Sequence, residues 1–518
     1  MIDADDAIRI GQFRQLFVDD FLIEKFDGVT RIYPSARKHP DNPLVTATLE
    51  SEGWEVYVCG TCMRDPNSGM FRLWYIGWVG DLRKHGGGDV YNLNYAISED
   101  GIGWTKPNLG LKLWDGSRDN NLLHSCQEDQ FYAGIDSICY SPEDPDPSRR
   151  YKFLSFWIDY RPYAQFSPDG IHWKLFDGNP IEFDRYGQST STNWDPYGQQ
   201  YLCAMRVETL EGTTAKAQRI LADRGGRFCG MRAGGISVSK DYLHWSPVRP
   251  TIIPDQTDDA MVPEYLAANP GVVESDEGPD YHHGQFNLTQ VFAYEGIYIM
   301  LLEVIAVSGG FGKHRHDGLL QTQLAFSRDL KTWTRVEDRS FFIPAGKGPR
   351  WTGDWDCGQT HSSSQPVRVG DELWFYYGGM DHSHFSEFYT YSEDGSTLFP
   401  QARSGIGLAV ARLDGFAAIE AGDEPGTLTT KPLVLTGTHL VINAECSEDG
   451  HVAIEILDHA GKPLPDFSLD RADRITGDSI RALSTWKDNP DIGKLNGRPL
   501  KLRFHLRNAR FYSFAVVV

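Results

Sequence analysis

The stretch Ala96-Ile-Ser98-Glu-Asp100-Gly-Ile-Gly-Trp104 decides the fold, because the same pattern returns along the chain. In each copy an apolar run leads into Ser-x-Asp, and an aromatic residue follows the Asp after a short turn. Internal repeats of this kind are the sequence signature of an architecture built from one recurring unit. The further copies are Phe166-Ser-Pro-Asp-Gly-Ile-His-Trp173, Val238-Ser-Lys-Asp-Tyr-Leu-His-Trp245, Phe326-Ser-Arg-Asp-Leu-Lys-Thr-Trp333 and the worn Ala411-Arg-Leu-Asp-Gly-Phe416.

The recurring unit predicts a hairpin. An Asp side chain caps its own turn by accepting backbone N–H groups, and the Trp then starts the next strand and packs on the sheet. Two more strand-like runs precede each copy, so each unit has four antiparallel strands. Five such units predict an all-β fold, a five-bladed β-propeller. The predicted blades span residues 46–110, 121–178, 181–252, 260–340 and 342–422.

Two further regions flank the predicted propeller, which spans residues 46–425. Residues 1–45 include the apolar run Leu16-Phe-Val-Asp-Asp-Phe-Leu-Ile23, which we expect to pack on the ring. Residues 430–518 contain alternating strands without a Ser-x-Asp turn, as in His451-Val-Ala-Ile-Glu-Ile-Leu457. This change of sequence pattern predicts a separate C-terminal β-sandwich.

Composition and charge narrow the function classes. The chain has 518 residues and a net charge of −21, which disfavours nucleic-acid partners because phosphate binding needs a basic surface. No apolar run is long enough to span a bilayer, so no membrane partner is expected. The eight cysteines do not cluster like a disulfide framework or a zinc site. The acidic start lacks a signal-peptide pattern, which fits a cytoplasmic protein or a secreted or periplasmic one whose signal was removed. Oligomeric state is left open.

A five-bladed propeller followed by a β-sandwich resembles the glycoside hydrolases of the fructosidase and arabinofuranosidase–xylosidase kind, families 32 and 43. More closely, the chain is similar to uncharacterised bacterial family-32-like proteins. The matching segments, which lie along nearly the whole chain, are Leu16–Ile23, Val291-Phe-Ala-Tyr-Glu-Gly-Ile-Tyr298, Leu324-Ala-Phe-Ser-Arg-Asp329, Gly370-Asp-Glu-Leu-Trp-Phe-Tyr-Tyr-Gly378 and Ala411–Phe416. The resemblance implies carbohydrate metabolism, with three carboxylates on innermost strands meeting over the propeller axis.

The resemblance implies catalytic roles for two acids at the starts of blades 1 and 2. Glu55 stands where the family's first acid would be, as base or nucleophile, and Trp54 beside it could stack on a sugar ring. Asp136 lies inside the apolar run Ala133-Gly-Ile-Asp-Ser-Ile-Cys139 and matches the acid that tunes the pKa and orients the sugar. The structural alternative for Asp136 is a buried carboxylate satisfied by backbone N–H groups.

The third blade departs from the family pattern. The clan places its general-acid Glu on this inner strand, whereas the run Tyr186-Gly-Gln-Ser-Thr-Ser-Thr-Asn-Trp194 holds no carboxylate. Blade 5 offers a replacement, because Asp354 and Asp356 bracket Trp355 just before an inner strand. Asp356 is therefore the expected proton donor, with Asp354 as its substitute. The alternative is a turn capped by Asp.

Histidines form a second group of candidate site residues on the predicted site face. His282, His283, His314, His316, His382 and His384 precede or interrupt the strands of blades 4 and 5. Imidazoles there could bond sugar hydroxyls, share acid–base work or bind a metal, and the alternative is exposed loop histidines. The expected substrate-binding set is Trp54, Trp78, Asp159, Arg206, His283, Gln285, His316, Asp354, Trp355, His361 and His382.

The first hypothesis is a glycosidase that cleaves an oligosaccharide in a pocket at the propeller centre. General acid–base work on a glycosidic bond needs two flanking carboxyl groups. No cofactor is required by this scheme, although a metal ion near the axis is compatible with the histidines. The alternatives are a lyase or metal-assisted enzyme that uses these histidines, and a carbohydrate-binding propeller without catalysis.

Overall fold

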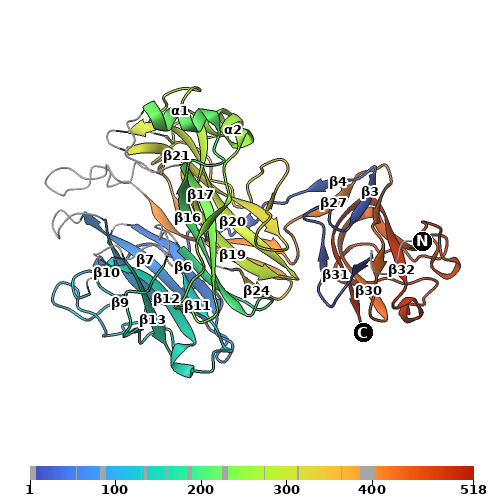
Figure 1. Cartoon of the computed structure of the whole chain (residues 1–518), viewed down its shortest axis with the longest axis horizontal. Helices are drawn as coiled ribbons and strands as arrows, with labels where there is room; N and C mark the ends of the chain where they lie inside the picture. The colour runs from blue at the N-terminus through green and yellow to red at the C-terminus, as the bar shows by residue number, and fades with distance from the viewer. Residues whose placement is uncertain are drawn as a thin grey trace.

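In the part of the chain that the structure describes, the protein is mostly β, with two short helices. The computed structural model describes residues 7–53, 55–81, 89–129, 131–132, 137–157, 161–183, 190–223, 231–273, 275–311, 314–362, 365–384 and 403–518. Its strands divide between a larger body and a smaller C-terminal body, which lie side by side in Figure 1. The helices are α1 (Ala215–Asp223) and α2 (Gln256–Ala268). Short 3-10 turns are η2 (Glu50–Glu52), η4 (Pro147–Arg149), η6 (Pro465–Phe467) and η7 (Gly493–Leu495).

The larger body contains five antiparallel groups of strands that follow one another along the chain. Group 1 holds β6 (Glu55–Arg64), β7 (Phe71–Asp81), β8 (Asp89–Ser98) and β9 (Leu122–His124). Group 2 holds β10 (Phe131–Tyr132), β11 (Ile138–Tyr140), β12 (Tyr151–Trp157), β13 (Pro162–Ser167) and β14 (Lys174–Leu175). Group 3 holds β15 (Thr190–Asp195), β16 (Gln200–Thr209), β17 (Met231–Ser239) and β18 (Arg249–Ile252).

Groups 4 and 5 are joined into one sheet by a single parallel contact between Leu320 and Gln359. Group 4 holds β19 (His283–Tyr294), β20 (Ile297–Phe311), β21 (His314–Ser327) and β22 (Thr334–Arg335). Group 5 holds β23 (Gln359–Ser362), β24 (Val367–Val369), β25 (Glu372–Met380), β26 (Ser404–Arg412) and β5 (Arg37–Lys38).

The Ser-x-Asp turns form as their sequence predicts. Asp100 Oδ1 accepts the backbone N–H groups of Ile102 and Gly103, both at 2.8 Å, and Gly101 N–H donates to Ser98 Oγ at 2.8 Å. These backbone hydrogen bonds lower the pKa of Asp100. The turns at Asp169, Asp241 and Asp329 repeat the pattern. The Asp of each of these four turns therefore has a structural role.

Two boundaries differ from the sequence prediction. The fourth strand of group 1 is β9, which the predicted blades placed at the start of the second unit. The segment after Trp104 instead makes an isolated bridge between Ile97 and Thr105 and then a long excursion back to the sheet. In group 5 the outer strand β5 comes from the N-terminal segment, with Ala409 opposite Lys38. A distant piece of chain therefore completes this group.

The N-terminal segment also belongs to the smaller body. Its strands β1 (Ile8–Arg9), β2 (Gln15–Leu16), β3 (Ile23–Asp27) and β4 (Thr30–Ile32) pair within one ten-stranded sheet with the C-terminal strands. Those strands are β27 (Ala418–Ala421), β28 (Gly426–Thr430), β29 (Leu433–Val434), β30 (His439–Asp458), β31 (Asp478–Leu483) and β32 (Pro499–Val517).

Alternation within one short run divides the apolar side chains of this segment between two cores. Leu16 and Val18 pack with Phe292 of the larger body. Phe17 points the other way into the C-terminal core, where its ring lies 4.9 Å from that of Phe511. Successive strand residues face opposite sides, so one run can join two cores.

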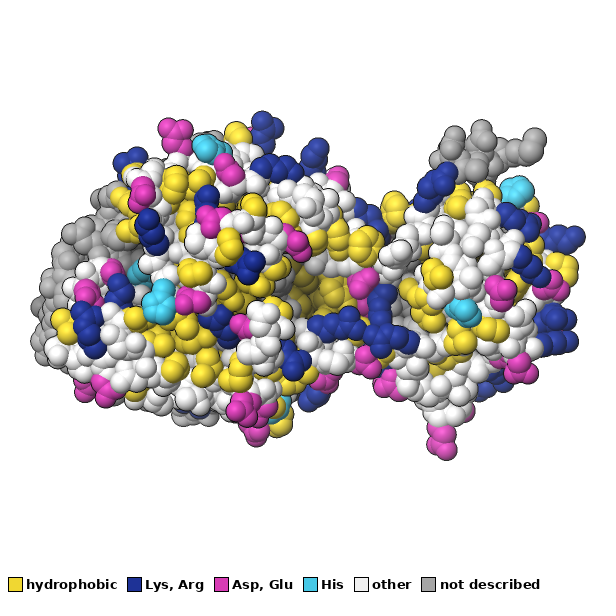
Figure 2. All heavy atoms as spheres, turned by 90° about the horizontal axis from the view of Figure 1, so that it is seen from below, with side chains coloured by type: hydrophobic (Ala, Val, Ile, Leu, Met, Phe, Trp, Pro, Cys, Tyr) yellow, Lys and Arg dark blue, Asp and Glu magenta, His cyan; other side chains and the backbone are white. Residues whose placement is uncertain are grey.

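Asp414, in the worn fifth copy of the repeat, ties the two bodies together. Its buried carboxylate accepts Arg14 Nη1 at 2.7 Å, Tyr294 Oη at 2.7 Å and Ser513 Oγ at 2.6 Å. A further ion pair joins Arg412 to Asp478 at 2.6 Å. Figure 2 shows basic and acidic side chains meeting at the waist between the bodies. This junction holds the orientation of the two bodies through several buried contacts.

Candidate functional site

A buried carboxylate and a buried imidazole face each other where groups 1 and 5 meet. Glu55, the first residue of β6, is 3% exposed, and its Oε1 lies 3.3 Å from His382 Nε2. Burial raises the pKa of Glu55, although the charge of His382 opposes the shift. Burial would lower the pKa of His382, but the nearby carboxylates of Glu55 and Asp381 outweigh it and raise that pKa. Each group therefore binds its proton more tightly than it would in water, and the two lie close enough to exchange one.

The turn before Glu55 is held by a fully buried carboxylate. Glu52 Oε2 accepts the backbone N–H groups of Thr48 and Leu49 at 2.7 and 2.8 Å. Lys106 Nζ lies 2.7 Å from Glu52 Oε1, which also accepts Tyr75 Oη. Gly53 follows with φ +68°, and a Cβ built there would lie 1.9 Å from the carbonyl oxygen of Trp78. Glu52 and Gly53 thus fix the backbone from which Glu55 projects.

Behind His382 lies a second charged pair. Asp381 Oδ1 is 3.6 Å from His382 Nδ1, and Arg403 Nε lies 2.8 Å from Asp381 Oδ2. The ring of Trp351 stacks on His382 with centroids 5.8 Å apart. The imidazole thus lies between two carboxylates, at 3.3 and 3.6 Å, and against one aromatic face.

A second buried acid, Glu303, stands in the middle of β20. It is fully buried and accepts Ser362 N–H at 2.8 Å and Asn287 Nδ2 at 2.9 Å. His361 Nδ1 lies 3.4 Å from Glu303 Oε2. Glu303 therefore positions Asn287 and His361 from behind.

Gln359 connects the histidines of group 5. Its Nε2 donates to the backbone oxygens of His382 and Ser383 at 3.2 and 3.3 Å. Its Oε1 consequently faces His361 Nε2 at 3.0 Å and His384 Nδ1 at 3.3 Å, so both of these ring nitrogens carry hydrogen. One amide thus sets the orientation of two imidazoles.

The contact with Arg232 shows whether the other ring nitrogen of His384 donates or accepts a hydrogen bond. Its Nη1 lies 3.1 Å from His384 Nε2, and a guanidinium can only donate. His384 Nε2 is therefore an acceptor, and the ring is neutral. Arg232 Nη1 also lies 3.1 Å from Asn287 Oδ1, and Arg206 Nη1 lies 3.5 Å from the same oxygen. The network therefore runs without a break from Asn287 on β19 to the turn after β25.

His283 and Gln285, both expected to bind substrate, are buried on β19. Gln285 Nε2 lies 2.9 Å from His283 Nε2, and His283 Nδ1 lies 2.7 Å from the backbone oxygen of Tyr281. Because the backbone oxygen can only accept, His283 Nδ1 carries hydrogen and Nε2 accepts from the amide. These hydrogen bonds stabilise the start of β19.

The structure gives the predicted proton donor Asp356 another set of partners. Asp356 is 2% exposed, its Oδ2 lies 2.5 Å from Lys38 Nζ, and Tyr377 Oη donates to the same oxygen at 2.7 Å. These contacts tie β5 to group 5. Asp354 Oδ2 accepts Lys347 N–H at 2.7 Å and so caps a turn, which was the structural alternative. We therefore reassign Asp356 as an anchor of group 5.

The predicted stacking residues are packed within the sheets. Trp78 is 3% exposed, and its ring stacks with that of Tyr91 at 6.4 Å. Trp355 packs on Tyr377 with centroids 5.7 Å apart and covers Gly379. A sugar ring needs an open aromatic face, and Trp78 is too deeply buried to offer one.

Several predictions fall outside the described part of the chain. Trp54, Asp136 and Asp159 lie there, and their roles stay predictions. His316 is part of β21, but its side chain is also outside the description.

Sequence reasoning missed Glu303, Asn287, Gln359 and Trp351. Glu303 stands alone in the apolar run Ile297-Tyr-Ile-Met-Leu-Leu-Glu-Val-Ile305, which is the same signal that drew attention to Asp136. An acid inside an apolar strand needs buried partners, so this signal could have found Glu303. No comparable sequence pattern distinguishes Asn287, Gln359 or Trp351.

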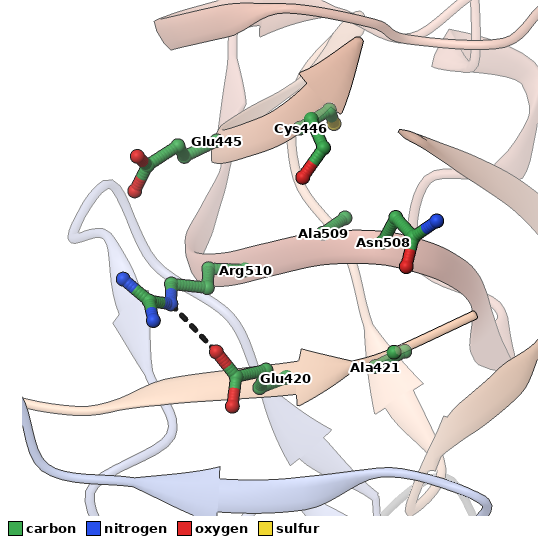
Figure 3. A pocket seen from close by; sticks show the side chains of 9 residues that line it. Glu420, Ala421, Glu445, Cys446, Asn508, Ala509 and Arg510 are labelled. Atoms are coloured by element: carbon green, nitrogen blue, oxygen red, sulfur yellow. Dashed lines mark hydrogen bonds and ion pairs between the residues drawn. The ribbon is translucent and has the colours of Figure 1, made fainter. Parts of the chain in front are cut away.

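The described residues lack a metal cluster and a membrane-spanning helix, and a pocket on them lies away from Glu55. Within those ranges, no three His, Cys, Asp or Glu side chains are grouped so as to hold a metal ion. No helix among them has the length and apolarity needed to cross a membrane. A pocket of about 440 Å³ lies on the C-terminal sheet, where Arg510 Nε donates to Glu420 at 2.7 Å (Figure 3). That ion pair uses both of these charges, and the pocket lies in the other body from Glu55.

Comparison with known proteins finds likeness only at the level of solved structures. No known family matches the sequence, and no curated protein matches it. A glycosyl hydrolase from Bacteroides ovatus is similar over 74% of this chain and 94% of its own, at 12% identity and a TM-score of 0.42. An N-acetylgalactosamine deacetylase from F. plautii, solved with blood group B trisaccharide, is similar over 75% and 97%, at 14% identity and a TM-score of 0.42. The Bombyx mori GH32 β-fructofuranosidase BmSUC1 is similar over 95% and 94%, at 10% identity and a TM-score of 0.38. The structural neighbours thus include glycoside hydrolases, among them a family-32 enzyme, which is the resemblance expected from the sequence.

Proposed function

We propose that the protein is a glycoside hydrolase in which Glu55 is the acid–base residue and His382 its proton partner. The five strand groups are taken as the blades of a five-bladed β-propeller, and the C-terminal sheet as a β-sandwich. The observation that carries the proposal is the Glu55–His382 contact at 3.3 Å in a buried setting. An oligosaccharide is the proposed substrate.

Environment gives Glu55 its proposed role. Burial disfavours the ionised carboxylate, so the raised pKa keeps a proton on Glu55 at a higher pH than in water. A carboxylic acid whose pKa is raised by burial can donate its proton to the oxygen of a departing sugar. His382 would then return the proton, since its Nε2 lies 3.3 Å from Glu55 Oε1. The second carboxylate is assigned to Asp136, as the family resemblance implies.

The test is hydrolysis of a panel of aryl glycosides and plant or algal oligosaccharides. Glu55→Gln should lower kcat by about 10²- to 10⁴-fold, the usual contribution of a general acid or base. Glu50→Gln is the matched control, because Glu50 lies exposed on the same 3-10 turn. Turnover that survives Glu55→Gln at the wild-type rate would refute the assignment.

A lyase is the second candidate, and the placement of His382 favours it. An imidazole between two carboxylates could remove a carbon-bound proton and eliminate the leaving sugar without water. Reaction in isotopically labelled water separates the two candidates, because hydrolysis places one water oxygen in the product and elimination places none. Metal dependence, which the sequence left open, would show as loss of turnover on chelation and recovery with one added metal.

A further inference from the structure

The tryptophan that lies against the proposed acid–base pair has an unusual backbone. Trp351 has φ +67°, a left-handed conformation that a bulky side chain rarely adopts. Residues held in this conformation carry strain, persist only where the surrounding structure imposes them, and cluster at functional sites. The ring of Trp351 stacks on that of His382, with centroids 5.8 Å apart and an angle of 25° between the planes. The strained residue is thus the one that covers the imidazole.

The turn that carries Trp351 is closed by its own residues. Asp354 N–H donates to the backbone oxygen of Lys347 at 2.8 Å, and Lys347 N–H donates to Asp354 Oδ2 at 2.7 Å. Inside this pair, Gly353 N–H donates to the backbone oxygen of Pro349 at 2.7 Å. These hydrogen bonds enclose Trp351 and hold its backbone in the left-handed conformation.

A second link joins the same turn to the chain beside His382. Arg403 Nη2 donates to the backbone oxygen of Gly353 at 2.6 Å, and Arg403 Nε lies 2.8 Å from Asp381 Oδ2. Asp381 directly precedes His382 in the sequence. The turn and the imidazole are therefore connected at two places, through the stacked rings and through Arg403.

Carboxylates surround the imidazole that the tryptophan covers. Glu55 Oε1 lies 3.3 Å from His382 Nε2, and Asp381 Oδ1 lies 3.6 Å from His382 Nδ1. Asp317 on β21 adds a third negative charge. Burial lowers the pKa of His382, but these carboxylates together outweigh it and raise that pKa. The protonated imidazole is thus the form that its surroundings favour.

We propose that Trp351 is a positioning residue, which holds the ring of His382 and stabilises its protonated form. The face of an indole ring attracts a cation that lies over it, and more strongly in a buried setting. A neutral imidazole gains less from the same face. Arg350 Cζ also lies 5.6 Å from the Trp351 ring centre, but a guanidinium keeps its charge over the pH range in which an imidazole titrates. The inference rests on the proposed function, because it gives Trp351 a catalytic purpose only if Glu55 and His382 share a proton.

Nuclear magnetic resonance of ring-labelled histidine tests the inference without requiring turnover. A His382→Gln variant identifies the signal of His382 among those of the 16 histidines. Trp351→Leu should lower the proton affinity of His382 about tenfold, as expected for loss of a buried cation–π contact. Trp351→Phe should recover about half of this loss, because phenylalanine keeps an aromatic face in a side chain not much larger than leucine.

Trp374 provides the matched control. It is another half-buried tryptophan of group 5, and its ring stacks on that of Phe71 at 5.8 Å and 24°. Trp374→Leu therefore loses a stack of the same geometry whose partner does not titrate, and it should leave the proton affinity of His382 unchanged. Thermal melting shows whether each variant folds. If Trp351→Leu does not fold, 5-fluorotryptophan replaces tryptophan in the wild-type chain, and its weaker ring face should also lower the proton affinity of His382.

The outcomes separate this inference from the proposed function. A tenfold loss in Trp351→Leu with partial recovery in Trp351→Phe, but no turnover of any glycoside by the wild type, would support the positioning role and count against hydrolysis. Glu55-dependent hydrolysis with an unchanged proton affinity of His382 in Trp351→Leu would support hydrolysis and overturn the positioning role. An equal loss in the Leu and Phe variants would also overturn it. Where both proposals hold, the basic limb of the kcat–pH profile should move to lower pH in Trp351→Leu, because His382 loses its proton earlier.

Discussion

Replacing Glu52 by Gln should destabilise the turn that carries Glu55. Glu52 is fully buried, and its two oxygens accept from Lys106, Tyr75 and the backbone N–H groups of Thr48 and Leu49. A glutamine keeps the shape but offers one accepting oxygen, so at least one buried donor loses its partner and the ammonium loses its counter-charge.

The expected loss can be worked from these contacts. Breaking a buried ion pair by removing one partner typically reduces the free energy of unfolding by about 3–5 kcal/mol. Lys106 is 14% exposed, so water can reach part of its ammonium group and the effect should lie at the lower end. We therefore expect a loss of about 3 kcal/mol for Glu52→Gln. Activity should fall as well, because β6 begins with Glu55 only three residues after Glu52, and a distorted turn would displace the Glu55 side chain.

Urea unfolding is the assay, followed by intrinsic tryptophan fluorescence of the larger body. The double variant Glu52→Gln/Lys106→Met closes a double-mutant cycle and should recover about half of the loss, because it removes the orphaned charge. Glu50→Gln, exposed on the same turn, should change the midpoint little. A loss below about 1 kcal/mol for Glu52→Gln, or strict additivity in the cycle, would refute the reasoning.

The remaining predictions concern three other features of the larger body. Gly53→Ala should lower the melting temperature far more than Gly110→Ala, since both have positive φ but only the first Cβ would meet a backbone oxygen; equal melting temperatures would contradict this. Lys38→Met should destabilise the protein by about 3 kcal/mol because it leaves its buried carboxylate partner unpaired, whereas the exposed Lys25→Met should not, as unfolding curves would show. Burial opposes the shift at Asp169, but backbone N–H groups and a neighbouring imidazole lower its pKa to about 2. A lowered pKa in the folded state adds stability above the unfolded pKa, so stability should fall as pH drops from about 4 to 2; Asp169→Asn should flatten that part of the stability–pH curve.

Local chemistry determined what the sequence could predict. The Ser-x-Asp turns close through hydrogen bonds between residues two and three positions apart, so their motif is sufficient to specify them. Because each turn depends on nearby residues only, its repeated pattern allowed the sequence to predict the repeated four-stranded units. Glu55 and His382 were also readable as polar residues at the ends of apolar strands.

Tertiary structure alone decided which of those residues meet. Glu55 and His382 lie far apart in the sequence and come into contact because groups 1 and 5 are neighbours in space. Asp356 looked like an acid beside the site, yet a lysine from the N-terminal segment holds it in a structural ion pair. The partners of Glu303 come from two other strands, so only the fold shows which residues this acid contacts.

The physical reason is the range of the interactions. Turn formation and strand alternation depend on neighbours in sequence, and a single pattern records them. Strand pairing between distant segments, such as β5 with β26, and the partners of buried charges depend on which surfaces the whole fold brings together. The sequence by itself therefore determined the repeating unit and its turns, whereas the packing of distant segments decided the roles of the acids and the membership of the N-terminal strands.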